Sequence, residues 1–141
     1  MDISSKRVQI DKKTIFRTFN QYYFDLLNMM KKYGSSSQEF SKFYAYNYYL
    51  KKMNIKLFIK TWNETISMFY FDEIMKGNVA YFLNKDYSED IKGNEAFAQK
   101  YSLETYIQYF KKTYDNLEKD LVAIFVEKIQ QLTALSRSYF N

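Results

Sequence analysis

The hydrophobic positions in the first part of the chain repeat every three or four residues. The repeat runs from Ile15 to Tyr33 and follows Asp11, whose side chain can accept hydrogen bonds from the first free amides of a helix. Gly34 comes next, where helices commonly end in a left-handed glycine. The pattern therefore predicts an amphipathic helix over residues 11–33.

Two further helices are predicted in the next part of the chain. Ser36 and Glu39 have the spacing of a capping box, and the apolar positions after them continue to about residue 52. A third helix is expected over residues 55–76, before Gly77, and it is apolar on nearly every side. We expect this third helix to lie at the centre, with the other helices packed around it.

The rest of the chain divides into a polar connection and a long final helix. Residues 78–101 hold one apolar turn and a weakly periodic polar run, which predicts a long connection with short helical turns. From Ser102 to Tyr139 neither Gly nor Pro interrupts the apolar pattern, so one continuous helix is expected. Its apolar seam changes face over residues 117–125, which predicts contacts with two neighbours at once. The far end of this helix either packs within the domain or protrudes to bind a partner.

Composition supports an all-α fold. The chain has 141 residues, no proline and 3 glycines, whereas β-rich folds need both residue types at their tight turns. This length suits a single domain with its own core. We therefore predict a helical bundle of four to five main helices with a long C-terminal helix, formed by residues 11–141 behind a flexible basic arm of residues 1–10.

The residue types that most enzymes use for catalysis are missing. Cysteine and histidine are both absent, so neither a thiolate nucleophile nor an imidazole base can be assembled. The chain also lacks a phosphate-binding glycine loop. Asp86, Glu89 and Asp90 form the tightest carboxylate cluster, but their spacing does not fit a calcium loop and is typical of a solvated acidic loop. We predict a protein that is not an enzyme and has no metal site and no cofactor.

The net charge of +5 is unevenly distributed, with its excess toward the N-terminus. Lysines crowd the start of the first predicted helix, where the helix macrodipole favours acids, and an anionic partner would explain this exception. A second basic stripe lies beside Tyr48, Tyr49 and Trp62, whose rings would suit stacking on bases. Codon usage in an AT-rich genome would enrich lysine in the same way. The residues of this nucleic-acid-binding alternative are Lys6, Arg7, Lys12, Lys13, Arg17, Lys52, Lys56 and Lys60.

The main functional prediction is a helical interaction or structural protein that binds a protein partner or a second copy of itself. The end of a long last helix is expected to extend beyond the shorter helices of the bundle, which would leave its apolar side chains uncovered. The predicted contact residues are Leu132, Leu135, Tyr139 and Phe140.

The chain shows no sign of a membrane anchor or of secretion. No apolar run approaches the length needed to span a bilayer, and the first residues lack the apolar core of a signal peptide. An intracellular protein that is not secreted is therefore expected.

Two stretches carry a family resemblance. Residues 54–66 place Trp62 in a predicted helix, and residues 74–87 place an aromatic pair before Lys85-Asp86-Tyr87. This combination resembles a pattern found in small uncharacterised helical proteins of nucleocytoplasmic large DNA viruses. The resemblance implies a viral protein, present in the host cytoplasm or in the virion, and it brings no active-site residues with it.

Overall fold

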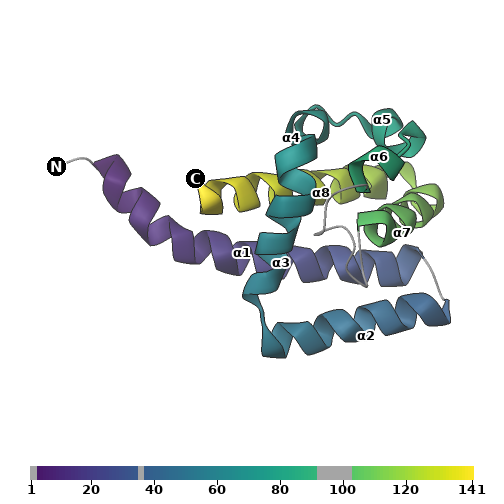
Figure 1. Ribbon diagram of the computed structural model, residues 1–141, viewed down its shortest axis with the longest axis horizontal. Coiled ribbons are helices and arrows are strands. Elements are labelled where there is room, and N and C mark those ends of the chain that lie inside the picture. The colour runs from purple at the N-terminus through teal and green to yellow at the C-terminus, as the bar shows by residue number, and fades with distance from the viewer. Residues whose placement is uncertain (1–2, 35–36, 92–102) are drawn as a thin grey trace.

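The computed structural model describes residues 3–34, 37–91 and 103–141, and the side chains of residues 12–34, 37–90 and 105–141. The regular secondary structure of these ranges is helical throughout, which confirms the predicted all-α fold (Figure 1). Its elements are α1 (Ile3–Tyr33), α2 (Gln38–Met53), α3 (Lys56–Trp62), η1 (Asn63–Ser67), α4 (Met68–Met75), α5 (Val79–Asn84), α6 (Ser88–Ile91), α7 (Leu103–Asn116) and α8 (Lys119–Phe140).

The centre of the bundle is the pair formed by α1 and α8, which make the most extensive helix contact of the described structure. They run alongside each other in Figure 1, and α2 lies on the other side of α1. The continuous unit α3–η1–α4 crosses both central helices instead of lying between them. It leaves Met68 and Phe69 exposed. Residues 55–76 therefore do not hold the predicted central place, because α1 and α8 offer each other longer apolar stripes.

The starts of the first two helices differ from the predicted ones. Helix α1 begins at Ile3 and not at Asp11, so the segment predicted as an arm carries the first turns of this helix. Helix α2 is capped by Ser37, whose hydroxyl accepts a hydrogen bond from the amide of Phe40 at 3.1 Å. The predicted cap, Ser36, lies outside the described residues.

Gly34 ends α1 for a reason other than the predicted left-handed backbone. Among the glycines that the structure describes, only Gly77 has a positive φ, of 70°, and it ends α4. A Cβ atom at Gly34 would clash with the hydroxyl of Thr113 and would lie 2.6 Å from the carbonyl oxygen of Met30. The missing side chain thus allows α7 to pack closely against the end of α1.

The predicted long C-terminal helix is present as α8, which has 22 residues, but the prediction of one continuous helix over residues 102–139 is wrong, because the described part of this range forms two helices. Glu118 has an extended backbone, with φ −70° and ψ 158°, and it precedes the first turn of α8. The break folds α7 back on α8, so that the rings of Phe110 and Phe125 stack with centroids 5.5 Å apart. A continuous helix would separate these two residues by about 22 Å along its axis. The change of apolar face in the sequence therefore marks the turn between two helices.

The polar connection predicted over residues 78–101 contains two short helices, α5 and α6, in the part that the structure describes. Helices α5 and α6 are tied to α4 by the hydroxyl of Tyr70, which donates a hydrogen bond to Asp90, and Lys85 makes an ion pair with Asp90 at 3.4 Å. Asp86 accepts hydrogen bonds from the amide and the hydroxyl of Ser88, at 3.0 and 2.7 Å. The carboxylates of this segment thus stabilise local structure. In the described part of the chain, no three acidic side chains come close enough together to hold a metal ion.

None of the helices within the described ranges combines the length and the apolar content that crossing a membrane requires.

Candidate anion-binding surface

Basic side chains are concentrated in one part of the fold. Residues 12–60 carry 10 Lys and Arg against 2 Asp and Glu, a net charge of +8, whereas residues 61–141 carry 9 against 12, a net charge of −3. All ten basic side chains of the first group are exposed. They lie on α1, α2 and α3, while the acidic excess lies on the other helices. The helices α1, α2 and α3 therefore form a strongly basic part of the fold.

A row of aromatic rings runs along the seam between α1 and α2. The rings of Tyr44 and Tyr48 on α2 have centroids 4.8 Å apart, and Tyr48 lies 4.8 Å from Phe24 on α1. The hydroxyl of Tyr44 also donates a hydrogen bond to Asn28 at 2.7 Å. These contacts hold the two helices in a fixed register.

Two lysines lie over these rings. The ammonium nitrogen of Lys31 is 4.4 Å from the centroid of Tyr44, and that of Lys51 is 4.8 Å from Phe24 and 5.6 Å from Tyr48. Cation–π attraction at an exposed site contributes about 0.5–1 kcal/mol, and it limits the motion of an otherwise flexible side chain. The rings thus fix two positive charges at the surface.

Lys13 and Arg17 continue this row along α1. Lys13, Arg17, Phe24 and Lys31 follow at intervals of four, seven and seven residues, which places them on one face of the helix. With a rise of 1.5 Å per residue, the row extends over about 27 Å from Lys13 to Lys31. We call Lys13, Arg17, Lys31 and Lys51 the α1–α2 basic ridge. Among the described side chains, no carboxylate forms an ion pair with any of the four.

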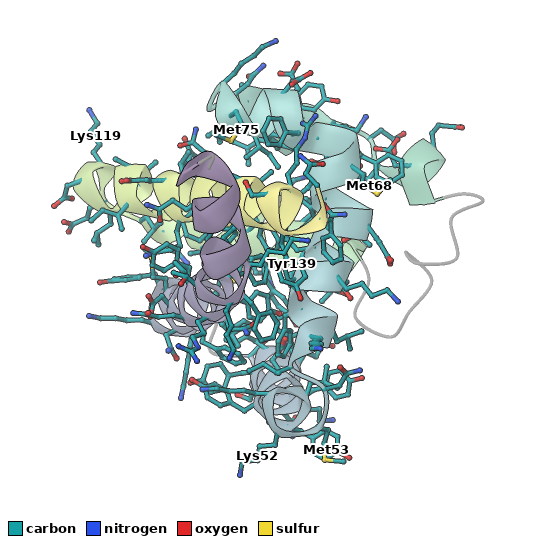
Figure 2. The ribbon with its side chains drawn as sticks, turned by 90° about the vertical axis from the view of Figure 1, so that its left-hand side faces the viewer. Lys52, Met53, Met68, Met75, Lys119 and Tyr139 are labelled. Carbon is teal, nitrogen blue, oxygen red and sulfur yellow. The ribbon has the colours of Figure 1, made fainter. Side chains whose placement is uncertain are left out.

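The outward face of α2 carries a second basic and aromatic stripe. Lys42, Tyr46, Tyr49 and Met53 are exposed and follow at helical intervals. Tyr49 is 58% exposed, so its ring is open to solvent. Figure 2 shows Lys52 beside Met53 at the end of this helix. These four residues lie on the face of α2 that is turned away from Tyr44, Tyr48 and Lys51, so the stripe adds positive charge and two exposed rings to α2 on a different face from the α1–α2 seam.

The structure places the predicted nucleic-acid-binding residues on three helices. Lys12, Lys13 and Arg17 are exposed on α1, whereas the side chains of Lys6 and Arg7 lie outside the described residues. Lys52 lies exposed in the last turn of α2, and Lys56 and Lys60 are exposed on α3, which turns away from α2. The predicted second stripe therefore spans two helices of different direction.

The aromatic residues predicted beside that stripe have different environments. Trp62 is only 5% exposed and its indole N–H donates a hydrogen bond to Thr133, so it cannot stack on a base. Tyr48 is half-buried, and Tyr49 alone of the three is open. The sequence analysis missed Lys31 and Lys51, because only the packing of α2 on α1 brings them into one row.

The predicted contact residues at the end of α8 are largely covered. Leu132 is fully buried, and Leu135 and Tyr139 pack against the core. The ring of Tyr139 lies 5.9 Å from that of Phe16, because α1 runs past the end of α8 and covers it (Figure 1). Leu132 is therefore unavailable to a partner in this fold. Of the four residues, Phe140 is the exposed one, at 47%.

Phe140 borders an open cleft of about 500 Å³ between the end of α8 and the unit η1–α4. Met68 stands at the same cleft and is 70% exposed. Arg137 and Asp72 contribute charges of opposite sign, and the guanidinium of Arg137 lies 4.1 Å from the ring centroid of Phe71. The cleft thus combines apolar contact surface with one cation and one anion.

The basic ridge has the chemistry of a phosphate-binding surface. Its ammonium and guanidinium groups are donors that suit phosphate oxygens, and they stand on rigid helices. Hydrogen bonding with Tyr48 raises the pKa of Tyr44 to about 12, so this ring adds no negative charge near neutral pH. Comparison of the chain with protein-family models, with curated proteins and with solved structures gives no match.

Proposed function

We propose that this protein binds nucleic acid through the α1–α2 basic ridge, by contacts with phosphate groups. The observation that carries the proposal is the exposure of 10 basic side chains over residues 12–60, against 2 acidic ones. Nucleic acids present phosphates at regular intervals over the whole length of such a row. Lysines already held in place lose less side-chain freedom when they meet a phosphate.

Binding is proposed to be largely independent of base sequence. The rings next to the ridge offer few open faces to bases, because Phe24 is buried under Lys51, and Tyr44 and Tyr48 are half-buried. Phosphate contacts position a protein on nucleic acid but carry no sequence information. Tyr49 is an open ring on the other face of α2, turned away from Lys51, so it adds at most a preference for unpaired strands.

Salt dependence tests the proposal directly. Affinity for a short DNA duplex of mixed sequence is measured by fluorescence anisotropy at several salt concentrations. Four phosphate contacts predict a log–log slope of about −3.6, since each contact contributes about −0.9. Replacing Lys31 and Lys51 together with Gln should reduce the magnitude of the slope by about 1.8.

A matched control is the double variant Lys76→Gln and Lys119→Gln, which removes two exposed lysines outside the ridge, one after α4 and one at the start of α8, and should leave the slope unchanged. Equal losses in both variants would show that only net charge matters and would contradict the proposed site. Tighter binding to vesicles of anionic lipid than to DNA would instead identify a membrane surface as the partner.

For the cleft at Phe140 we propose a second function, the contact with a second copy of the chain. Arg137 and Asp72 line the same cleft, and neither makes an ion pair with another described side chain. In a two-fold symmetric dimer, each residue of such a pair can face the opposite charge of the other copy. Met68 and Phe140 would supply the apolar part of the contact.

Light scattering over a range of protein concentrations tests self-association. The double variant Met68→Ala and Phe140→Ala should weaken the dimer, whereas Met53→Ala, at an equally exposed methionine of α2, should not. A chain that stays monomeric at high concentration, or a dimer that the double variant leaves intact, would contradict this second proposal.

A further inference from the structure

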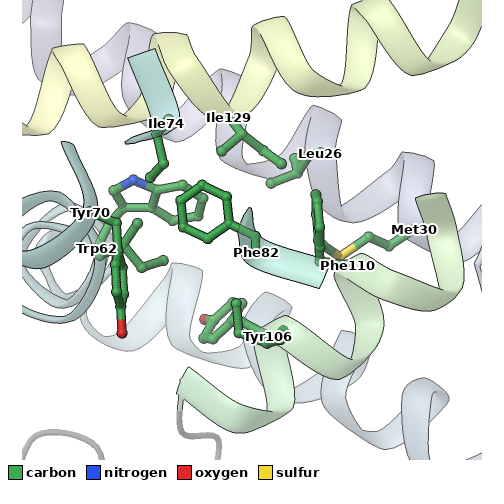
Figure 3. Close-up of a pocket in the computed structure, with 11 residues that line it drawn as sticks. Leu26, Met30, Trp62, Tyr70, Ile74, Phe82, Tyr106, Phe110 and Ile129 are labelled. Atoms are coloured by element: carbon green, nitrogen blue, oxygen red, sulfur yellow. The ribbon is translucent and has the colours of Figure 1, made fainter. Parts of the chain in front are cut away.

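An apolar cavity of about 80 Å³ lies between the two hydrophobic clusters of the fold (Figure 3). On one side are Leu26 of α1 and Trp62 of α3, which belong to the main core. On the other side are Tyr70 of α4 and Phe82 of α5, which belong to the smaller cluster. Ile129 of α8 points into the space between them in Figure 3. The cavity thus forms where α4 and α5 dock on the main body.

The polar atoms of the residues around this cavity are engaged elsewhere. The indole N–H of Trp62 donates to Thr133 at 3.1 Å, and the hydroxyl of Tyr106 shares a hydrogen bond of 2.7 Å with Tyr23. The hydroxyl of Tyr70 donates to Asp90. The remaining lining residues are Leu, Ile, Met and Phe. A bound molecule therefore finds no hydrogen-bonding partner on these walls.

We infer that this cavity binds one small, uncharged, apolar molecule. A buried water needs two or more polar partners, so an apolar cavity of this kind stays dry and favours an apolar occupant. An engineered cavity of about 150 Å³ with a similar lining accepts benzene or xenon. The present cavity has about half that volume, so the ligand class is limited to apolar atoms and molecules smaller than benzene.

Phe82 forms one wall of this cavity, which is partly open to the surface. It stands on α5, a helix of 6 residues that packs against the body through a small cluster. The bond between Tyr70 and Asp90 ties the segment to α4, whereas the hydrogen bond from the hydroxyl of Tyr87 to the carbonyl of Phe82, at 2.9 Å, lies within the segment. Movement of α5 away from α8 would open this wall without disturbing the contact between α1 and α8.

Xenon is the probe for the test, because it is apolar and small enough for the cavity. Titration of the full chain with xenon, followed by xenon NMR, should show saturable binding. Ile129→Phe fills the space and should weaken xenon binding by about tenfold or more, since a close-packed interior leaves no room for the atom. Ile124→Phe is the matched control on the same helix, because Ile124 is 49% exposed, and it should bind xenon as the original chain does.

A second filling variant protects the test against a folding defect. If Ile129→Phe loses the helical circular dichroism signal, Ile107→Phe replaces it, since Ile107 lines the same cavity from α7. The inference is overturned if the original chain shows no saturable xenon binding. It is equally overturned if a folded filling variant binds xenon as tightly as the original chain.

Discussion

The indole nitrogen of Trp62 donates a hydrogen bond to the hydroxyl of Thr133 at 3.1 Å, inside the core. Trp62 is 5% exposed and Thr133 is fully buried, so water can replace neither partner. The bond joins α3 to α8 at the point where the crossing helical unit meets the central pair. The single tryptophan of the chain is therefore a structural residue.

Removing the acceptor of this bond should destabilise the fold. Thr133→Val keeps the shape of the side chain but leaves the buried indole N–H without a partner, which costs about 1–3 kcal/mol. Urea unfolding, followed by tryptophan fluorescence, measures the free energy of unfolding. Thr14→Val, at an exposed position of α1, is the control and should change it by less than about 0.5 kcal/mol. Equal stability of the two variants would contradict a role for the bond.

Gly34 and Gly77 should tolerate alanine poorly for different reasons. Gly34→Ala inserts a methyl group against Thr113, and such overpacking costs about 1–3 kcal/mol. Gly77→Ala forces a side chain into a positive φ, at a cost of about 1–2 kcal/mol. Adding Thr113→Ala should recover part of the stability lost by Gly34→Ala and none of that lost by Gly77→Ala. Thermal and urea unfolding of the single and double variants would measure this coupling.

Stability should fall at alkaline pH, because tyrosines that are buried in the folded chain ionise more readily in the unfolded chain. Burial raises the pKa of Tyr106 from its ordinary value of 10.0 to about 12, so between these values the folded chain keeps a proton that the unfolded chain releases. The contribution of Tyr106 is therefore present below pH 10 and is lost as the pH rises toward 12.

Urea unfolding over this pH range tests the role of Tyr106. Tyr106→Phe should reduce the slope of the decline by at most about 1.4 kcal/mol per pH unit. An exposed control is Ile124→Val, which removes no titrating group and should leave the slope unchanged. Identical slopes in the two variants and the original chain would contradict the effect of burial on Tyr106.

The hydrogen bond between Tyr70 and Asp90 should control the local opening of α5 and α6. Burial and the Asp90 carboxylate raise the pKa of Tyr70 well above its ordinary value, so the hydroxyl remains a donor at physiological pH. Tyr70→Phe removes this donor, and the loss of a bond worth about 1.4 kcal/mol speeds amide exchange about tenfold. Hydrogen exchange measured by mass spectrometry should show the change over residues 79–91 and leave α1 unaffected. A uniform change over all helices would indicate global destabilisation instead.

The sequence by itself was enough to predict the helical class and most helix positions. Apolar residues at intervals of three and four report the helical period directly, and Ile15 to Tyr33 fall within α1 as expected. The end of the third predicted helix before Gly77 is confirmed, because a residue with positive φ cannot continue a helix. These features depend on local backbone chemistry, which neighbouring residues determine.

The helix break at Leu117 and Glu118 needed the tertiary structure. No Gly or Pro marks it, so local propensity gives no reason to end α7 there. The break instead brings Phe110 against Phe125 within the core, and burial of apolar surface outweighs the local preference for a longer helix. The change of apolar face is present in the sequence, but the sequence does not show which of two structures causes it. One long helix could contact two different neighbours, or the chain could turn and form two helices.

The candidate site likewise depends partly on the sequence and partly on the tertiary structure. The excess of lysine over residues 12–60 is a property of the sequence, and exposure of these side chains follows from the cost of burying a charge. The sequence could not show that Lys51 of α2 lies over Phe24 of α1, or that Leu132 is buried, because both depend on which helices pack together. Residue types determined the charge of the surface, and long-range packing alone decided which of its residues share one ridge.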